Sequence, residues 1–177
     1  MNNVIKMFAV AISLSLAMVA SANTITVNEG LQGGKPNLEL SLGQPVDGNV
    51  GVFAYANVSE NWQEAYVGPK VYLPGYNVEV GVGAGVESNQ QNVRFGGYLW
   101  AGKDALSILI LAEDGGSGLW YKGELKYAID PKTSVSILRD INNGTGGQVE
   151  RKLDGTTTLR ARLYGEGKGD LGLKIAF

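Results

Sequence analysis

The chain has 177 residues with a formal net charge of −2, and it contains neither cysteine nor histidine. The absence of cysteine excludes disulfides, thiol nucleophiles and thiolate metal sites, and the absence of histidine removes the usual general base and the commonest metal ligand. A chain with this charge is not a polybasic nucleic-acid binder. We therefore expect no enzyme activity, no cofactor, no metal site and no nucleic-acid partner.

The N-terminal segment has the pattern of a secretory signal peptide. Lys6 is the only charge before an apolar run over residues 7–20, and small residues occupy positions 20–22. A short basic region, an apolar segment and an A-x-A site direct export and cleavage. A retained anchor is the alternative, but the run is shorter than the roughly 20 residues of a spanning helix. The sequence predicts a signal peptide over residues 1–22 and one exported domain over residues 23–177.

Two later segments alternate strictly between apolar and polar residues. Apolar or aromatic side chains fall on one face of residues 76–87, with Asn, Glu and Gly on the other, and residues 119–129 repeat the pattern. Ordinary strands have about 5–6 residues, whereas a tilted strand that crosses a membrane needs about 9–11. Both segments therefore favour membrane-crossing strands.

Similar but weaker alternation predicts further strands on both sides of these two segments. About 12 strands are expected, near residues 24–29, 37–43, 49–58, 64–73, 76–87, 92–102, 105–112, 118–129, 133–141, 147–153, 156–164 and 170–177. The pattern is weakest at 24–29 and 147–153, so barrels of about 10 or 8 strands are the alternatives. An even number of strands is the rule for bacterial single-chain barrels.

The predicted connections alternate in length along the chain. One set is short and rich in turn residues, at 44–48, 74–75, 103–104, 130–132 and 154–155. The other set is longer and polar, at 30–36, 59–63, 88–91, 113–117, 142–146 and 165–169. Outer-membrane barrels have short turns on the periplasmic side and longer loops outside. Aromatic residues near the strand ends also predict two interfacial girdles, formed by Trp62, Tyr66, Trp120, Tyr121 and Tyr164 at one end and Tyr72, Tyr76, Tyr98, Trp100, Tyr127 and Phe177 at the other.

The last strand carries an apolar face that ends in an aromatic residue. Leu171, Leu173, Ile175 and Phe177 share this face, because side chains alternate along a strand. Such an ending is typical of the terminal strand that the barrel-assembly machinery recognises. We expect this strand to pair with residues 24–29 and Phe177 to lie at the periplasmic end.

The signal pattern, the alternating strands and terminal Phe177 together resemble small bacterial outer-membrane β-barrels. Length and strand number are similar to those of YfaZ-type proteins and of the narrow porins for acidic sugars, although no residue motif is specific to either family. The resemblance implies an all-β, single closed antiparallel up-and-down transmembrane barrel in the outer membrane of a Gram-negative bacterium. It also implies lipid surroundings and passive solute passage.

Charged residues on the polar faces of the strands are the candidates for lining the lumen: Lys70, Glu79, Arg94, Lys122, Glu124, Lys126, Arg160, Arg162 and Lys174. Arg160 and Arg162 beside Lys174 would form a basic strip that favours anionic solutes. The alternative is that the arginines pair with Glu150 or Asp170 as a structural plug. Glycines at 81, 83 and 85 would leave space inside, or would relieve crowding.

Three functions remain open at this point. The first is a small porin-like channel, and the second is a closed barrel that acts through its surface loops as an adhesin, resistance factor or receptor. The third is a soluble periplasmic barrel with a lipocalin-like interior, which requires the apolar faces to point inward. The direction of Val80, Val82 and Leu125 distinguishes the third function from the other two.

Overall fold

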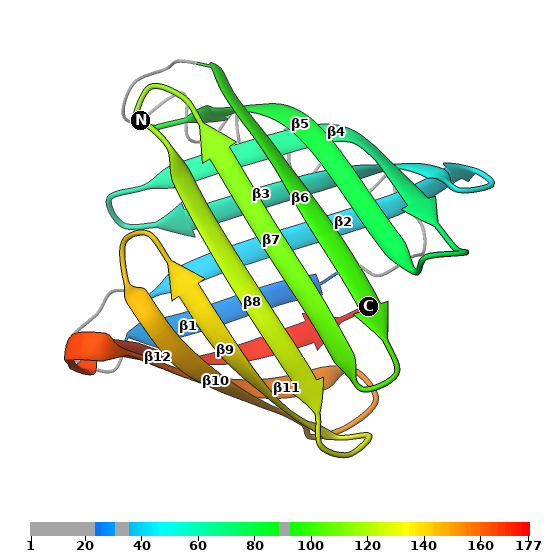
Figure 1. Ribbon diagram of the computed structural model, residues 1–177. Coiled ribbons are helices and arrows are strands. Elements are labelled where there is room, and N and C mark those ends of the chain that lie inside the picture. The colour runs from blue at the N-terminus through cyan, green and yellow to red at the C-terminus, as the bar shows by residue number, and fades with distance from the viewer. Residues whose placement is uncertain (1–23, 31–35, 89–92) are drawn as a thin grey trace.

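The computed structural model describes residues 24–30, 36–88 and 93–177, and Figure 1 shows them as a closed β-barrel. Twelve strands follow one another around the barrel in sequence order, and the first pairs with the last, all antiparallel. The predicted up-and-down barrel of about 12 strands is confirmed. The predicted signal peptide, residues 1–22, lies outside the described residues. Within the described ranges, no helix is long and apolar enough to span a membrane.

The strands have similar lengths around the barrel. They are β1 (Thr24–Gly30), β2 (Asn37–Asp47), β3 (Val50–Ser59), β4 (Gln63–Leu73), β5 (Val78–Glu87), β6 (Val93–Lys103), β7 (Leu106–Asp114), β8 (Trp120–Ala128), β9 (Thr133–Asp140), β10 (Gly144–Lys152), β11 (Thr157–Tyr164) and β12 (Gly169–Ala176). A short 3₁₀ turn, η1 (Gly165–Gly167), precedes β12. We call the end of the barrel with the connections 74–77, 104–105, 129–132 and 153–156 the turn rim, and the opposite end the loop rim.

Two predicted boundaries differ from the structure for local reasons. The predicted turn at 44–48 is wrong, since β2 continues to Asp47, with an irregular register between Pro45 and Asp47. Proline has no N–H to donate, so the strand passes it through a bulge-like step rather than ending there. The predicted strand at 76–87 begins instead at Val78, because Asn77 adopts φ 51° in the preceding turn.

The barrel closes between its two terminal strands. β1 pairs with β12 from Thr24 opposite Ala176 to Gly30 opposite Asp170, which confirms the predicted pairing. The N–H of Ala176 donates to the carbonyl oxygen of Thr156 at 2.9 Å, so the chain ends at the turn rim.

Apolar side chains cover the outside of the barrel. Val82 is 60% exposed and Leu125 is 45% exposed, while the charged residues that alternate with such positions are more buried. This arrangement is the reverse of the one a water-soluble binding barrel needs, because apolar surface is stable in water only when it is covered. A shallow apolar groove of about 700 Å³ lies on the outer face of β5–β7, with Phe95 and Leu119 on its walls.

The predicted aromatic girdles are wrong for several of their members. Tyr66 and Tyr164 are buried on the inner face, and Tyr98 points inward and donates to Glu79. Among the predicted girdle residues on strands, Tyr121 and Tyr127 lie outside. Sequence position places a residue near a strand end but does not choose its face, which depends on the register of alternation.

Inward aromatic rings also occupy the space that the β5 glycines leave. A Cβ on Gly81 would collide with the Tyr98 ring, and one on Gly83 would lie 3.0 Å from the Phe53 ring. Phe53 and Tyr98 pack edge to face with ring centroids 5.2 Å apart. The glycines therefore accommodate packed rings, and they do not widen the interior.

Asp154 at the turn rim provides the first testable prediction. Its Oδ1 accepts hydrogen bonds from the N–H groups of Thr156 at 2.8 Å and Thr157 at 2.7 Å, and these bonds hold its pKa below the usual range. The ionised carboxylate therefore stabilises the fold at pH values above its unfolded pKa of about 3.9, and this stabilisation is lost as pH falls through the lower folded pKa. Wild type should be more stable to urea than Asp154→Asn at pH 6, and the difference should shrink below about pH 4. A constant difference from pH 6 to pH 2 would contradict this account.

Candidate functional site

The structure places all nine predicted lumen residues on the inner face of the barrel. Their strands position them by alternation: in β8, Lys122, Glu124 and Lys126 point inward while Tyr121 and Leu125 point outward. Some of them contact partners on strands that are not neighbours: Lys126 of β8 pairs with Glu150 of β10, and Arg160 of β11 pairs with Glu39 of β2. They fall into two clusters on opposite parts of the wall and a smaller pair near the turn rim.

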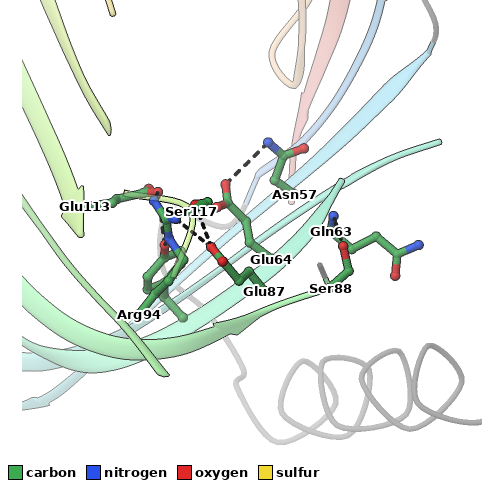
Figure 2. Close-up of polar contacts among 9 residues, drawn as sticks. Asn57, Gln63, Glu64, Glu87, Ser88, Arg94, Glu113 and Ser117 are labelled. Atoms are coloured by element: carbon green, nitrogen blue, oxygen red, sulfur yellow. Dashed lines mark hydrogen bonds and ion pairs between the residues drawn. The ribbon is translucent and has the colours of Figure 1, made fainter. Parts of the chain in front are cut away.

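The first cluster surrounds Arg94 on the wall formed by β4 to β7, as Figure 2 shows. Arg94 Nη1 lies 2.5 Å from Glu87 Oε2, and its Nη2 lies 3.4 Å from Glu113 Oε2. Arg94 Nε donates to the Tyr66 hydroxyl at 2.6 Å, and this hydroxyl donates to Glu113 at 3.0 Å. Arg94 and Glu87 are each 2% exposed, so this is a buried ion pair. We call Tyr66, Glu87, Arg94 and Glu113 the Arg94 cluster.

The Arg94 cluster also holds the connection between β7 and β8. Ser117 in this connection donates to Glu87 Oε2 at 2.8 Å and accepts a hydrogen bond from Arg94 (Figure 2). Glu64 lies nearby and accepts a hydrogen bond from Asn57 at 3.5 Å. Three carboxylates therefore gather around one guanidinium, which makes this wall acidic.

The second cluster, on β8 to β12, β1 and β2, contains the predicted basic strip. Arg162 Nε donates to both oxygens of Asp170 at 2.9 Å, and its Nη2 lies 3.9 Å from Glu39 Oε1. Arg160 Nη2 lies 3.7 Å from the same Glu39 oxygen and donates to Asn28. Arg162 is thus paired with Asp170, as the structural alternative expected, whereas Arg160 is held by the amide of Asn28 and a longer ion pair.

Lys126 and Glu124 form a second network on the same wall. Lys126 Nζ lies 2.7 Å from Glu150 Oε2 and 3.3 Å from Glu124 Oε1. Glu124 also accepts hydrogen bonds from Ser136 at 2.7 Å and Gln148 at 3.0 Å. Near the turn rim on the other wall, Lys70 pairs with Glu79 at 3.1 Å.

Lys122 and Lys174 differ from the other inner-face cations. Across residues 24–30, 36–88 and 93–177, neither lysine forms a hydrogen bond or an ion pair. Lys122 lies within electrostatic reach of Glu39 and Glu124 as well as of Arg160 and Arg162. Lys174 lies within reach of Glu150 and Glu124 as well as of Arg160 and Lys126. Arg160 Nε is also buried without a hydrogen-bond partner in the described part of the chain. We call Lys122 and Lys174 the open cations.

Sequence analysis missed the residues that hold these clusters together. Asn28, Glu39, Tyr66 and Glu113 were not among the predicted lumen residues, although each lies on a polar strand position or near a strand end. In the described ranges, no group of three or more acidic side chains is arranged to hold a metal ion. The predicted assembly residues Leu171, Leu173, Ile175 and Phe177 are all exposed on the outside, between 43% and 62%.

Several solved structures share this fold at low sequence identity. A structure described as a KdgM porin has a TM-score of 0.59 and 13% identity over 87% of this chain and 99% of that chain. A NanC porin has a TM-score of 0.57 and 10% identity over 88% of this chain and 99% of that chain. A protein from a study of the in-meso crystallization of membrane proteins has a TM-score of 0.62 and 11% identity over 89% of this chain and 83% of that chain. At these identities the three structures show a common fold. No family model matches the chain, and no curated protein matches it in sequence.

Proposed function

We propose that this protein is a narrow porin-like channel of the bacterial outer membrane that passes small solutes passively and favours anionic ones. The observation that carries the proposal is the presence of open cations on the inner face. A charged ammonium removed from water without a partner costs several kcal/mol, so Lys122 and Lys174 need water or a solute beside them. A hydrated passage along the β8–β12 wall supplies that water.

The surface and the fold neighbours support the same proposal. An apolar exterior on a closed barrel suits lipid, because closure leaves no unpaired strand edge in the hydrocarbon region. Two of the fold neighbours are described as porins. The exposed apolar residues of β12 suit recognition by the barrel-assembly machinery, which we propose as a partner during insertion. The channel acts without catalytic chemistry.

Purified protein in planar lipid bilayers should therefore show discrete conductance steps. Under a salt gradient, the reversal potential should indicate that anions pass more readily than cations. Persistent silence of a correctly folded protein would contradict a channel, and it would favour the closed barrel that acts through its surface loops.

The double substitution Lys122→Gln with Lys174→Gln should weaken the anion preference. A unit charge about 4 Å from an ion in water is worth about 1 kcal/mol, which corresponds to about a fivefold change in relative permeability for each lysine. The reversal potential of the double variant should shift accordingly, with conductance steps retained. Lys132→Gln, which removes a cation from an exposed turn, is the matched control and should leave the reversal potential unchanged. An equal shift in both variants would assign selectivity to the mouth of the barrel.

A further inference from the structure

Arg139 is a cation on the outer face of the barrel. In β9 the residues Ser136, Leu138 and Asp140 are buried on the inner face, whereas Ile137, 64% exposed, and Arg139 point outward. The guanidinium therefore belongs to the apolar exterior, where a charge is costly unless something satisfies it.

The protein provides hydrogen-bond acceptors for only part of the Arg139 guanidinium. Arg139 Nη1 donates to Thr145 Oγ1 at 3.0 Å, and among the described residues Arg139 forms no ion pair. Thr145 lies directly opposite on β10, and Gly123 lies directly opposite on β8. A Cβ on Gly123 would have no heavy atom within 4 Å, so open space borders the arginine on that side. A guanidinium has five N–H donors, and among the described residues only Thr145 accepts a hydrogen bond from Arg139.

The position of Arg139 along the strand places it near the headgroup level. It is the next-to-last residue of β9, and the N–H of the following Ile141 donates to Tyr121 on β8 at 3.2 Å. The β7–β8 hairpin extends beyond the β9–β10 hairpin at this rim, as Figure 1 shows. Arg139 therefore lies beside the part of the β7–β8 hairpin that projects past the β9–β10 hairpin. The cost of an outward arginine is largest at the bilayer centre and becomes small near the interface.

We propose that Arg139, with Thr145 and the space over Gly123, binds the phosphate of an anionic lipid headgroup in the leaflet at the loop rim. The planar fork of arginine matches two phosphate oxygens, and such charge-assisted pairs are stronger than neutral hydrogen bonds. A neighbouring apolar surface at Ile137 and Leu125 receives the acyl chains. This site rests on the membrane placement of the proposed function, and it is independent of conduction.

Arg151, a second outward-facing arginine, can be compared with Arg139. It also faces outward, lies opposite a threonine on the same pair of strands, and donates to Thr133 Oγ1 at 3.0 Å. It differs in one respect, because the carboxylate of Asp130 lies within electrostatic reach of it. Arg151 therefore has a carboxylate in its surroundings, and Arg139 forms no ion pair among the described residues.

Native mass spectrometry of the purified protein with phosphatidylglycerol tests the site. Arg139→Gln should weaken the tightest lipid binding about fivefold, since one basic residue near an anionic surface is worth about 1 kcal/mol. Arg151→Gln should weaken it less, and Arg139→Lys should retain the charge but lose part of the affinity. Retained conductance steps in Arg139→Gln would show that the variant folds and that the site is separate from the passage.

Each remaining outcome would overturn the proposal. Equal losses in Arg139→Gln and Arg151→Gln would mean that general surface charge attracts the lipid. An unchanged affinity in Arg139→Gln would mean that the lipid binds elsewhere. Displacement of phosphatidylglycerol by an equal concentration of inorganic phosphate would mean that the site recognises a free anion instead of a lipid headgroup.

Discussion

Replacing Arg94 by methionine should lower the free energy of unfolding by about 3–5 kcal/mol, the usual cost of leaving a buried charge without its partner. Arg94 donates to Glu87 and Tyr66 and lies 3.4 Å from Glu113, and both Arg94 and Glu87 are almost fully buried. Methionine preserves part of the volume but removes every donor. Glu87 and Glu113, the two ion-pair partners of Arg94, would then remain in the interior without a cation. Urea unfolding of the protein in lipid vesicles measures the change.

Two further variants separate the lost ion pair from a general packing defect. Adding Glu87→Gln to Arg94→Met removes one of the stranded charges, so the double variant should be more stable than Arg94→Met alone. Lys70→Met breaks an ion pair whose side chains are 17% and 27% exposed, and it should cost only about 0–1 kcal/mol. Equal costs for Arg94→Met and Lys70→Met would contradict the role assigned to burial.

The Arg94 cluster also connects the barrel wall to the loop rim. Ser117 reaches the cluster from the connection between β7 and β8, and it contacts both members of the buried ion pair. In Arg94→Met this connection should lose its contact with the wall, and its amide hydrogens should exchange faster than in wild type. The same substitution thus links the stability of the wall to the order of a surface loop.

The architecture was predictable because every strand of a barrel repeats the same alternation of apolar and polar residues. Alternation over residues 76–87 and 119–129 indicated the strands, and the apolar ending of the chain indicated that it would pair with residues 24–29. Predictions failed where a single residue departs from this alternation. Pro45 continues a strand through an irregular step, and Tyr66 and Tyr98 occupy the inner face near strand ends.

Nine charged residues were assigned to the inner face from the sequence, but several of their partners on that face were not. Alternation assigns Arg94 and Arg160 to the interior, yet it does not say which residues lie across the lumen from them. Those contacts depend on barrel closure and on the stagger between strands. Closure brings Glu39 of β2 to Arg160 of β11, two residues separated by most of the sequence. Consequently the structural alternative, pairing with Glu150 or Asp170, was correct for Arg162 and wrong for Arg160, which pairs with Glu39.

The outward direction of Leu125 leads to a second prediction with a large effect. Leu125 lies near the middle of β8, and its outward cross-strand neighbours are Ile108 and Ile137. In a bilayer, Leu125→Arg should lower the free energy of unfolding by about 2–4 kcal/mol, because the charge enters the hydrocarbon region. In water, a substitution at such an exposed position would change stability by about 0.5 kcal/mol or less.

The cost of an outward arginine depends on its depth in the membrane, so a second position nearer the rim serves as the control. Ile129 is 58% exposed and lies just beyond the end of β8 at the turn rim, so Ile129→Arg should cost about 0–1 kcal/mol. Urea unfolding of both variants in phosphatidylcholine vesicles gives the two values. A large cost at Leu125 with a small cost at Ile129 requires an apolar medium around the middle of the barrel. Equal, small costs at both positions would mean that water surrounds the barrel, and the proposed channel would then lose the membrane that it has to cross.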